Sequence, residues 1–164
     1  MITKELGQTG VYIPEVGIGT WNYHAGPWPL RSGLEAGALF IDTAESYGRE
    51  DMVREAVDGR RDRVFIATKV SPQNFRSQDL RKSVDASLLR LGIDAIDLLQ
   101  LHAPNSSSIP IEETMGAMKR TLGTLIDRVR KKEQGMLFKS LWELSFDFEG
   151  FSEGMLNLLQ QFGG

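Results

Sequence analysis

Four short apolar segments recur along the first hundred residues of the chain and predict β-strands. Each is rich in Val, Ile, Leu or Phe and contains no proline. Their apolar residues are nearly continuous, which is typical of parallel strands buried on both faces rather than of strands with one exposed face. The predicted strands are residues 16–20, 39–43, 64–70 and 96–101.

Segments with helical spacing of apolar residues follow these strands. The clearest pattern, over residues 78–91, is expected to be capped by Ser77 at its start and to end at Gly92. It places four apolar side chains on one face: Leu80, Val84, Leu88 and Leu91. The other helices are predicted over residues 31–38, over residues 50–58, and from Pro110 to about Glu133.

Strand and helix thus alternate four times, which predicts right-handed crossovers between parallel strands. This pattern leaves two α/β architectures open, a doubly wound sheet or part of a barrel. The last residues differ, because no further strand is predicted beyond residue 135. Two amphipathic patterns, over residues 136–144 and 151–162, predict a mainly helical tail.

Composition excludes several classes of protein. The 164 residues carry a net charge of −3 and include no cysteine and only two histidines, so disulfides and thiolate chemistry are excluded and a zinc site is not expected. No apolar run approaches the roughly 20 residues of a membrane span, and the N-terminus lacks an export signal. We therefore expect a cytoplasmic protein that does not bind membranes. The short basic clusters are flanked by acids, so no nucleic-acid partner is expected.

Four polar residues stand at, or just beyond, the carboxyl ends of the predicted strands. They are Asp42, Tyr47, Lys69 and His102. Because the carboxyl ends of parallel strands open onto one face of the sheet, we expect these side chains to converge there.

The four residue types together suggest proton delivery to a carbonyl oxygen. A phenol is a weak acid, so Tyr47 needs a cation such as Lys69 to stabilise its phenolate. Asp42 would hold Lys69, and His102 would donate a hydrogen bond to the carbonyl. The hydride would have to come from a reduced nicotinamide. Each residue taken singly also fits a structural role, but their joint order and positions favour the catalytic interpretation.

Five strings of residues resemble the aldo-keto reductases in order and spacing. They are VGIGTW (16–21), FIDTAESYGRED (40–51), FIATKV (65–70), LRLGIDAIDLLQLHAP (89–104) and PIEETMGAM (110–118). The resemblance covers roughly residues 1–120. It implies a (β/α)8 barrel that reduces aldehydes or ketones to alcohols by hydride transfer from NADPH, with a small carbonyl compound as substrate.

The resemblance also assigns roles to the four polar residues. In the family's pattern Tyr47 is the general acid, Lys69 promotes its ionisation, Asp42 supports the lysine, and His102 orients the carbonyl. The catalytic residues implied are therefore Asp42, Tyr47, Lys69 and His102.

A second group of residues matches the family's cofactor-binding positions. Gly19, Thr20 and Trp21 correspond to the first βα loop, which in the family lies beside the nicotinamide. Together with Asp42 they are the cofactor-binding residues implied for NADPH. No metal ligands are expected.

The chain departs from the family after Met118. The family's next strand carries a stretch like G-K-I-R-x-I-G-V-S-N-F, whereas this chain continues with Glu133, Gln134 and Gly135 and then MLFKSLWELSFDFEG. We therefore expect a partial (β/α)8 TIM barrel of about four βα units over residues 1–120. Residues 121–164 would be a divergent, mainly helical tail of the same domain, and the chain would be truncated, with its own activity in question.

Two functions follow from this interpretation. One is an NADPH-dependent reductase whose cofactor site is incomplete. The alternative is a non-catalytic interaction or regulatory protein that retains the half-barrel scaffold. In either case a half-barrel exposes the edges of its sheet, which favours either self-association into a homo-oligomer or coverage of these surfaces by the aromatic tail.

Overall fold

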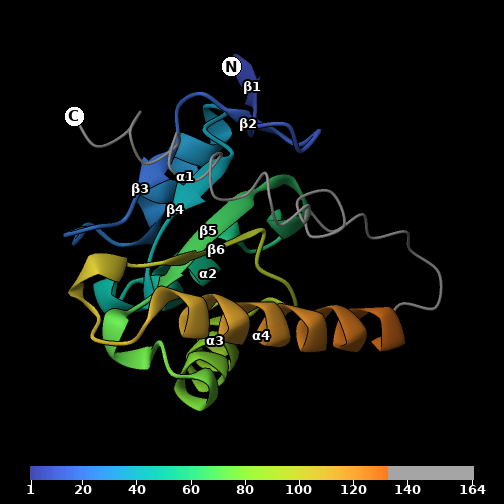
Figure 1. The fold of residues 1–164 in the computed structure, drawn as a ribbon. Coiled ribbons are helices and arrows are strands. Elements are labelled where there is room, and N and C mark those ends of the chain that lie inside the picture. Colours follow the sequence, from blue (N-terminus) through green and yellow to red (C-terminus); the bar gives the residue numbers. More distant parts are fainter. Residues whose placement is uncertain (133–164) are drawn as a thin grey trace.

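A four-stranded parallel sheet forms the centre of the molecule (Figure 1). The computed structural model describes residues 1–132, and side chains are described as far as residue 125. The strands lie in the order of the sequence and match the four predicted segments, each shortened at one or both ends. They are β3 (Ile18–Gly19), β4 (Phe40–Asp42), β5 (Phe65–Val70) and β6 (Leu98–Leu101).

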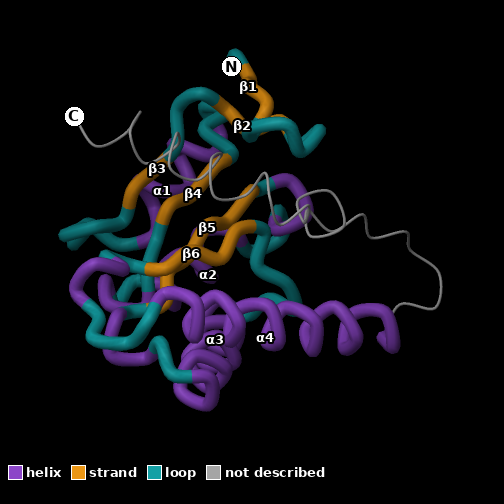
Figure 2. The backbone as a smooth tube through the Cα atoms, viewed as in Figure 1, coloured by secondary structure: helices purple, strands orange, loops and turns teal. Residues whose placement is uncertain are grey.

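A helix follows each of these strands (Figure 2). The helices are α1 (Pro27–Glu35), α2 (Glu50–Val57), α3 (Ser77–Leu91) and α4 (Ile111–Lys132). The four predicted βα units are therefore confirmed. The tail helices predicted over residues 136–144 and 151–162 lie outside the described residues.

The helices pack on one face of the sheet and bury its apolar side chains. Ile41 and Ile66 form a core with residues of α1, α2 and α3, including Leu34, Val53 and Leu91. A second core joins Val70 of β5 to apolar residues of α3 and α4: Leu80, Val84, Ala117 and Met118. Because a doubly wound sheet needs helices on both faces, this one-sided packing favours part of a barrel among the described residues.

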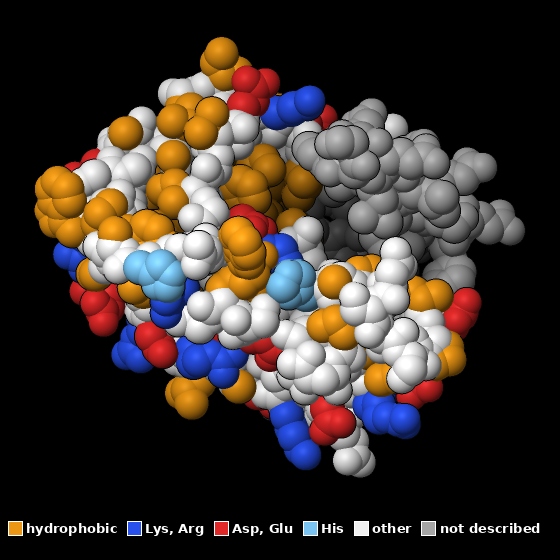
Figure 3. All heavy atoms as spheres, turned by 90° about the vertical axis from the view of Figure 1, so that its left-hand side faces the viewer, with side chains coloured by type: hydrophobic (Ala, Val, Ile, Leu, Met, Phe, Trp, Pro, Cys, Tyr) orange, Lys and Arg blue, Asp and Glu red, His pale blue; other side chains and the backbone are white. Residues whose placement is uncertain are grey.

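The opposite face of the sheet carries the remaining side chains of each strand, because side chains alternate between the two faces along a β-strand. At its amino end the rings of Phe40 and Phe65 meet edge to face, with centroids 5.7 Å apart. Towards the carboxyl end Asp42 is in register with Ala67, and Lys69 is in register with Gln100. Figure 3 shows a hollow, with hydrophobic side chains at its back and charged side chains at its edge.

Two local features differ from the sequence-based expectation, and a third agrees with it. Helix α1 begins at Pro27 rather than at residue 31, because proline favours the first turn of a helix. Ser77 does not cap α3: it is the first helical residue, the N-cap is Arg76, and the Ser77 hydroxyl accepts a hydrogen bond from Arg120 at 3.2 Å. Gly92 does end the helix as predicted, with φ of 65°.

An antiparallel hairpin at the N-terminus was not predicted. It pairs β1 (Thr3–Glu5) with β2 (Tyr12–Pro14). These strands are too short to show a clear period in the sequence, which is why the pattern missed them.

A buried carboxylate joins α2 to its neighbours. Glu50, the first residue of α2, is 1% exposed. Its Oε1 accepts a hydrogen bond from the Thr68 hydroxyl of β5 at 2.7 Å. Its Oε2 lies 2.8 Å from Nε and 2.6 Å from Nη2 of Arg90 in α3. One side chain therefore links two helices and the sheet.

A second acidic residue, Asp97, makes a hydrogen bond and an ion pair near the amino ends of the strands. Asp97 precedes β6, accepts a hydrogen bond from the Ile66 amide at 2.7 Å, and pairs with Arg61 at 2.8 Å. Burial raises the pKa of Asp97 above its usual value, and this effect outweighs the opposing charge of Arg61 and the amide hydrogen bond. Asp97 therefore braces β5 against β6 away from the converging polar side chains.

Within residues 1–132, none of the helices combines the length and the apolar character that a membrane-crossing segment requires.

We predict that Glu50→Ala destabilises the fold by about 2–4 kcal/mol, because it leaves the Thr68 hydroxyl and the Arg90 guanidinium without their buried partner. Urea unfolding of the full chain at neutral pH measures this change. The matched control is Glu55→Ala on the exposed side of the same helix, which we expect to change stability by less than about 0.5 kcal/mol. Equal effects of the two substitutions would contradict the role given to Glu50.

Candidate active site

The four polar residues predicted at the strand ends lie together in the structure. Asp42 is the last residue of β4, Lys69 lies near the end of β5, and His102 follows β6 directly. Tyr47 belongs to a single 3-10 turn, η1 (Glu45–Tyr47), in the loop between β4 and α2. Parallel strands in a common register bring these positions to one edge of the sheet.

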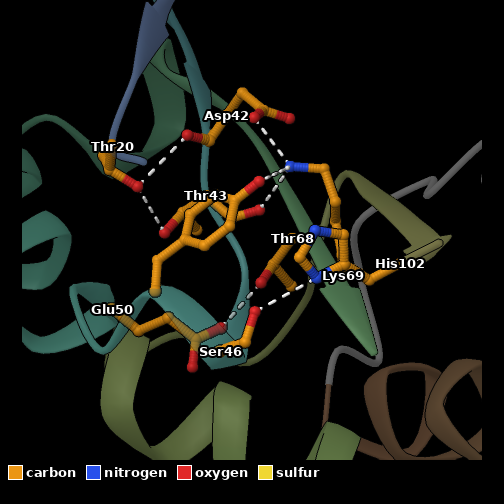
Figure 4. A network of polar contacts seen from close by, with 9 residues as sticks. Thr20, Asp42, Thr43, Ser46, Glu50, Thr68, Lys69 and His102 are labelled. Atoms are coloured by element: carbon orange, nitrogen blue, oxygen red, sulfur yellow. Dashed lines mark hydrogen bonds and ion pairs between the residues drawn. The ribbon is translucent and has the colours of Figure 1, made fainter. Parts of the chain in front are cut away.

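The Lys69 ammonium is the centre of this group (Figure 4). Its Nζ donates to Oδ2 of Asp42 at 2.7 Å and to the carbonyl oxygen of Thr43 at 3.0 Å, and it lies 3.4 Å from the Tyr47 hydroxyl. The Lys69 side chain is only 14% exposed. An ammonium has three protons to donate, and all three have acceptors here. The cation is therefore held at the phenolic oxygen.

His102 packs against the ring of Tyr47. The two rings meet at 84° with centroids 5.4 Å apart. The Nδ1 atom of His102 lies 3.1 Å from the hydroxyl of Ser46, and its backbone amide donates to the Val70 carbonyl at 2.8 Å. The amide contact extends the pairing of β5 with β6 by one residue, so the sheet itself sets the position of the imidazole.

The first βα loop borders the same edge of the sheet. Gly19 is in register with Asp42, and a Cβ added at Gly19 would have no atom within 4 Å. Trp21 is 73% exposed. The space beside Asp42 is therefore open on the β3 side.

Thr20 lies between Gly19 and Trp21 in the chain but is fully buried. Its hydroxyl is 2.8 Å from the Thr43 hydroxyl, and its amide donates to the Asp42 carbonyl at 3.0 Å. The hydroxyl therefore holds β3 against β4, and any direct contact of Thr20 with a ligand would have to use its backbone.

Arg49 ties this first loop to the loop that carries Tyr47. Its Nη2 donates to Nδ1 of His24 at 2.8 Å, its Nη1 donates to the Gly48 carbonyl at 3.0 Å, and its Nε donates to the Tyr23 carbonyl. The contact between Arg49 and His24 joins residues 25 positions apart, so the spacing of residue types in the sequence gave no indication of it.

Glu45 is a second residue that the sequence did not single out. Its Oε1 accepts hydrogen bonds from the Ser71 amide at 2.6 Å and from the Asn74 side chain at 2.9 Å, and its Oε2 accepts one from the Ser83 hydroxyl. The turn η1 is thereby held to the loop after β5 and to α3. The only sequence signal was an acidic residue two positions before Tyr47.

These contacts set the ionisation of Glu45. Burial alone would raise the pKa of this carboxyl, but the hydrogen bonds from Ser83, Ser71 and Asn74 together outweigh burial, so the pKa of Glu45 is lowered from its usual value.

Much of the chain is similar to proteins of one known family. The profile of the "Aldo/keto reductase family" matches residues 15–122. The methylglyoxal reductase YeaE of Escherichia coli (strain K12) is 40% identical over 122 residues, which make up 68% of this chain and 42% of that protein. The chain spans about two fifths of the length of the curated relatives it matches.

Solved structures give the same result. The thermostable aldo-keto reductase Tm1743, solved with the inhibitor epalrestat, has a TM-score of 0.70 and 33% identity, covering 84% of this chain and 60% of that one. An aldo-keto reductase from Klebsiella pneumoniae, solved with NADPH, has a TM-score of 0.66 and 34% identity, covering 76% and 47%. The described residues thus have the fold of part of a (β/α)8 barrel, as the sequence predicted.

We predict that Glu45→Gln lowers stability by about 1 kcal/mol at neutral pH, because the amide cannot replace all three accepted hydrogen bonds. Since the pKa of Glu45 is lowered by folding, its contribution is present above the usual pKa of 4.5 and is lost as the pH falls through the lowered value. Urea unfolding from pH 7 to pH 3 should show the two proteins converging in acid. The exposed Glu55→Gln is the control, and a difference that stays constant with pH would contradict the prediction.

Proposed function

This chain belongs to the aldo/keto reductase family, and from that premise we propose that its described residues supply the proton-transfer side of a site that reduces aldehydes or ketones to alcohols. The observation that carries the proposal is the Lys69 ammonium, which bridges the Asp42 carboxylate at 2.7 Å and the Tyr47 hydroxyl at 3.4 Å. A cation held at a phenolic oxygen favours release of the phenolic proton.

The surroundings of Asp42 fit a nicotinamide cofactor. The open space at Gly19 lets a flat ring approach the backbone of β3, and Trp21 offers an exposed aromatic face beside it. We propose that Gly19, Thr20, Trp21 and Asp42 border NADPH, with Thr20 acting through its backbone and through its hold on β4. When bound, NADPH supplies the hydride that the side chains of this site cannot provide.

In the proposed reaction the protein handles the proton. Tyr47 donates its phenolic proton to the carbonyl oxygen as the carbonyl carbon receives the hydride, so the C=O double bond becomes the C–O–H group of the alcohol. Lys69 stabilises the phenolate that remains, and Asp42 keeps Lys69 in place. His102 orients the carbonyl by donating a hydrogen bond to its oxygen.

The substrate class follows from the same groups. A single hydroxyl donor and an imidazole suit one carbonyl oxygen, so we propose a small aldehyde or ketone, by analogy with the methylglyoxal reductase that the chain resembles. The cytoplasmic location expected from the sequence stays a prediction.

We predict that Tyr47→Phe lowers the rate of NADPH-dependent reduction of a nitrobenzaldehyde by at least about a hundredfold, because the general acid is lost. Absorbance of NADPH measures turnover, and its fluorescence on titration measures binding. Tyr12→Phe is the matched control, since Tyr12 lies exposed on β2. Full activity of Tyr47→Phe would contradict the assigned role.

Failure of the chain to bind NADPH would overturn the reductase proposal for this chain. It would favour the alternative of a non-catalytic interaction protein that retains the scaffold.

We further predict self-association of the chain. Among the described residues, the outer edges of β3 and β6 pair with no other strand, and all four residues of β6 are half-buried. Unpaired edges present free amide and carbonyl groups to other chains. Light scattering after size-exclusion chromatography measures the mass in solution, and a monomer at all concentrations would contradict this prediction.

A further inference from the structure

Ser46 contacts His102 from the middle of the turn η1. Its hydroxyl oxygen lies 3.1 Å from Nδ1 of the imidazole (Figure 4). Ser46 is exposed, so water can serve the lone pairs of the hydroxyl while its hydrogen points at the ring. None of the reaction steps above uses this residue.

The direction of this hydrogen bond decides what His102 can do. A neutral imidazole carries one N–H, and the other ring nitrogen only accepts. If Ser46 donates to Nδ1, the ring proton is on Nε2. If Nδ1–H donates to Ser46, then Nε2 is bare and cannot donate to a carbonyl oxygen, which is itself only an acceptor.

Of the two arrangements, only the first lets His102 donate from Nε2. Within the part of the chain that the structure describes, Nε2 of His102 makes no hydrogen bond, so it is available to a substrate. The imidazole contacts the ring of Tyr47, whose hydroxyl lies 3.4 Å from the Lys69 ammonium.

We propose that Ser46 is a positioning residue that donates a hydrogen bond to Nδ1 of neutral His102 and so keeps the ring proton on Nε2, where it can reach the substrate oxygen. The inference rests on the proposed reductase function for its consequence. The tautomer itself can be measured without any activity.

The chain provides an internal reference for that measurement, because it has only two histidines. His24 receives a hydrogen bond at Nδ1 from Arg49, whose guanidinium can only donate, and its Nε2 lies 3.0 Å from Oδ1 of Asn22. His24 must therefore carry its proton on Nε2 when it is neutral.

The test is a long-range ¹H–¹⁵N correlation spectrum of the full chain labelled with ¹⁵N-histidine, recorded across the titration of the imidazoles. We expect neutral His102 in the wild type to match the Nε2–H pattern of His24. Ser46→Ala should shift the tautomer ratio of His102 by about fivefold towards Nδ1–H, the factor that an ordinary hydrogen bond provides.

A pair of variants with side chains of the same shape as each other separates the loss of the hydroxyl from a change in side-chain volume. Ser46→Thr keeps the hydroxyl and should preserve the ratio, whereas Ser46→Val has the same shape and should behave like Ser46→Ala. Ser77→Ala is the matched control, because it removes a serine hydroxyl that contacts Arg120 instead. It should leave His102 unchanged.

Activity gives a second readout with a distinctive pH profile. Ser46→Val should lower kcat by about fivefold relative to Ser46→Thr where His102 is neutral. The difference should disappear at lower pH, because the imidazolium carries a proton on both nitrogens. A purely structural role would give a loss that does not follow the titration of His102.

Two results would overturn the proposal. One is a wild-type spectrum in which neutral His102 carries its proton on Nδ1, and the other is an equal tautomer ratio in the folded Thr and Val variants. A Ser46-dependent tautomer in a chain without reductase activity would instead support the role of Ser46 while overturning the proposed function.

Discussion

The ion pair between Lys69 and Asp42 is the contact on which the arrangement of the site depends. It joins the ends of two neighbouring parallel strands at an Nζ–Oδ2 distance of 2.7 Å. Together with the Thr43 carbonyl at 3.0 Å, it leaves one ammonium proton for the Tyr47 hydroxyl. A lysine that is 14% exposed loses much of its hydration, so it needs these acceptors. The register of β4 and β5 is therefore a requirement of the site as well as of the fold.

Next to this ion pair, the short turn η1 makes contacts with three separate parts of the chain. In η1, Glu45 binds the loop after β5 and α3, Ser46 contacts His102 after β6, and Tyr47 meets Lys69. Three successive residues of a tight turn point in different directions, which lets a single turn reach several strand ends. Glu50 then anchors the helix that follows through buried contacts with β5 and α3.

The sequence was sufficient to predict the four strands of the parallel sheet, the four helices and the convergence of Asp42, Tyr47, Lys69 and His102. Apolar runs and helical periods are local signals, and the parallel topology brings strand ends together whatever side chains they carry. It was not sufficient for Glu45, Ser46 and Arg49. The partners that tie them to other segments lie 25 or more positions away in the chain, and no local pattern records such a pairing.

Residue types and their order along the chain thus specify which chemistry is available, since a phenol, an ammonium, a carboxylate and an imidazole follow successive strands. Folding specifies how those groups are used. The strand register places Lys69 against Asp42, the burial of Thr20 directs its hydroxyl to Thr43, and the turn η1 presents Ser46 to Nδ1 of His102. Hydrogen bonds require donor–acceptor distances that are held to within a few tenths of an ångström, and the side chains reach such positions only once the packed helices have set the strands in place.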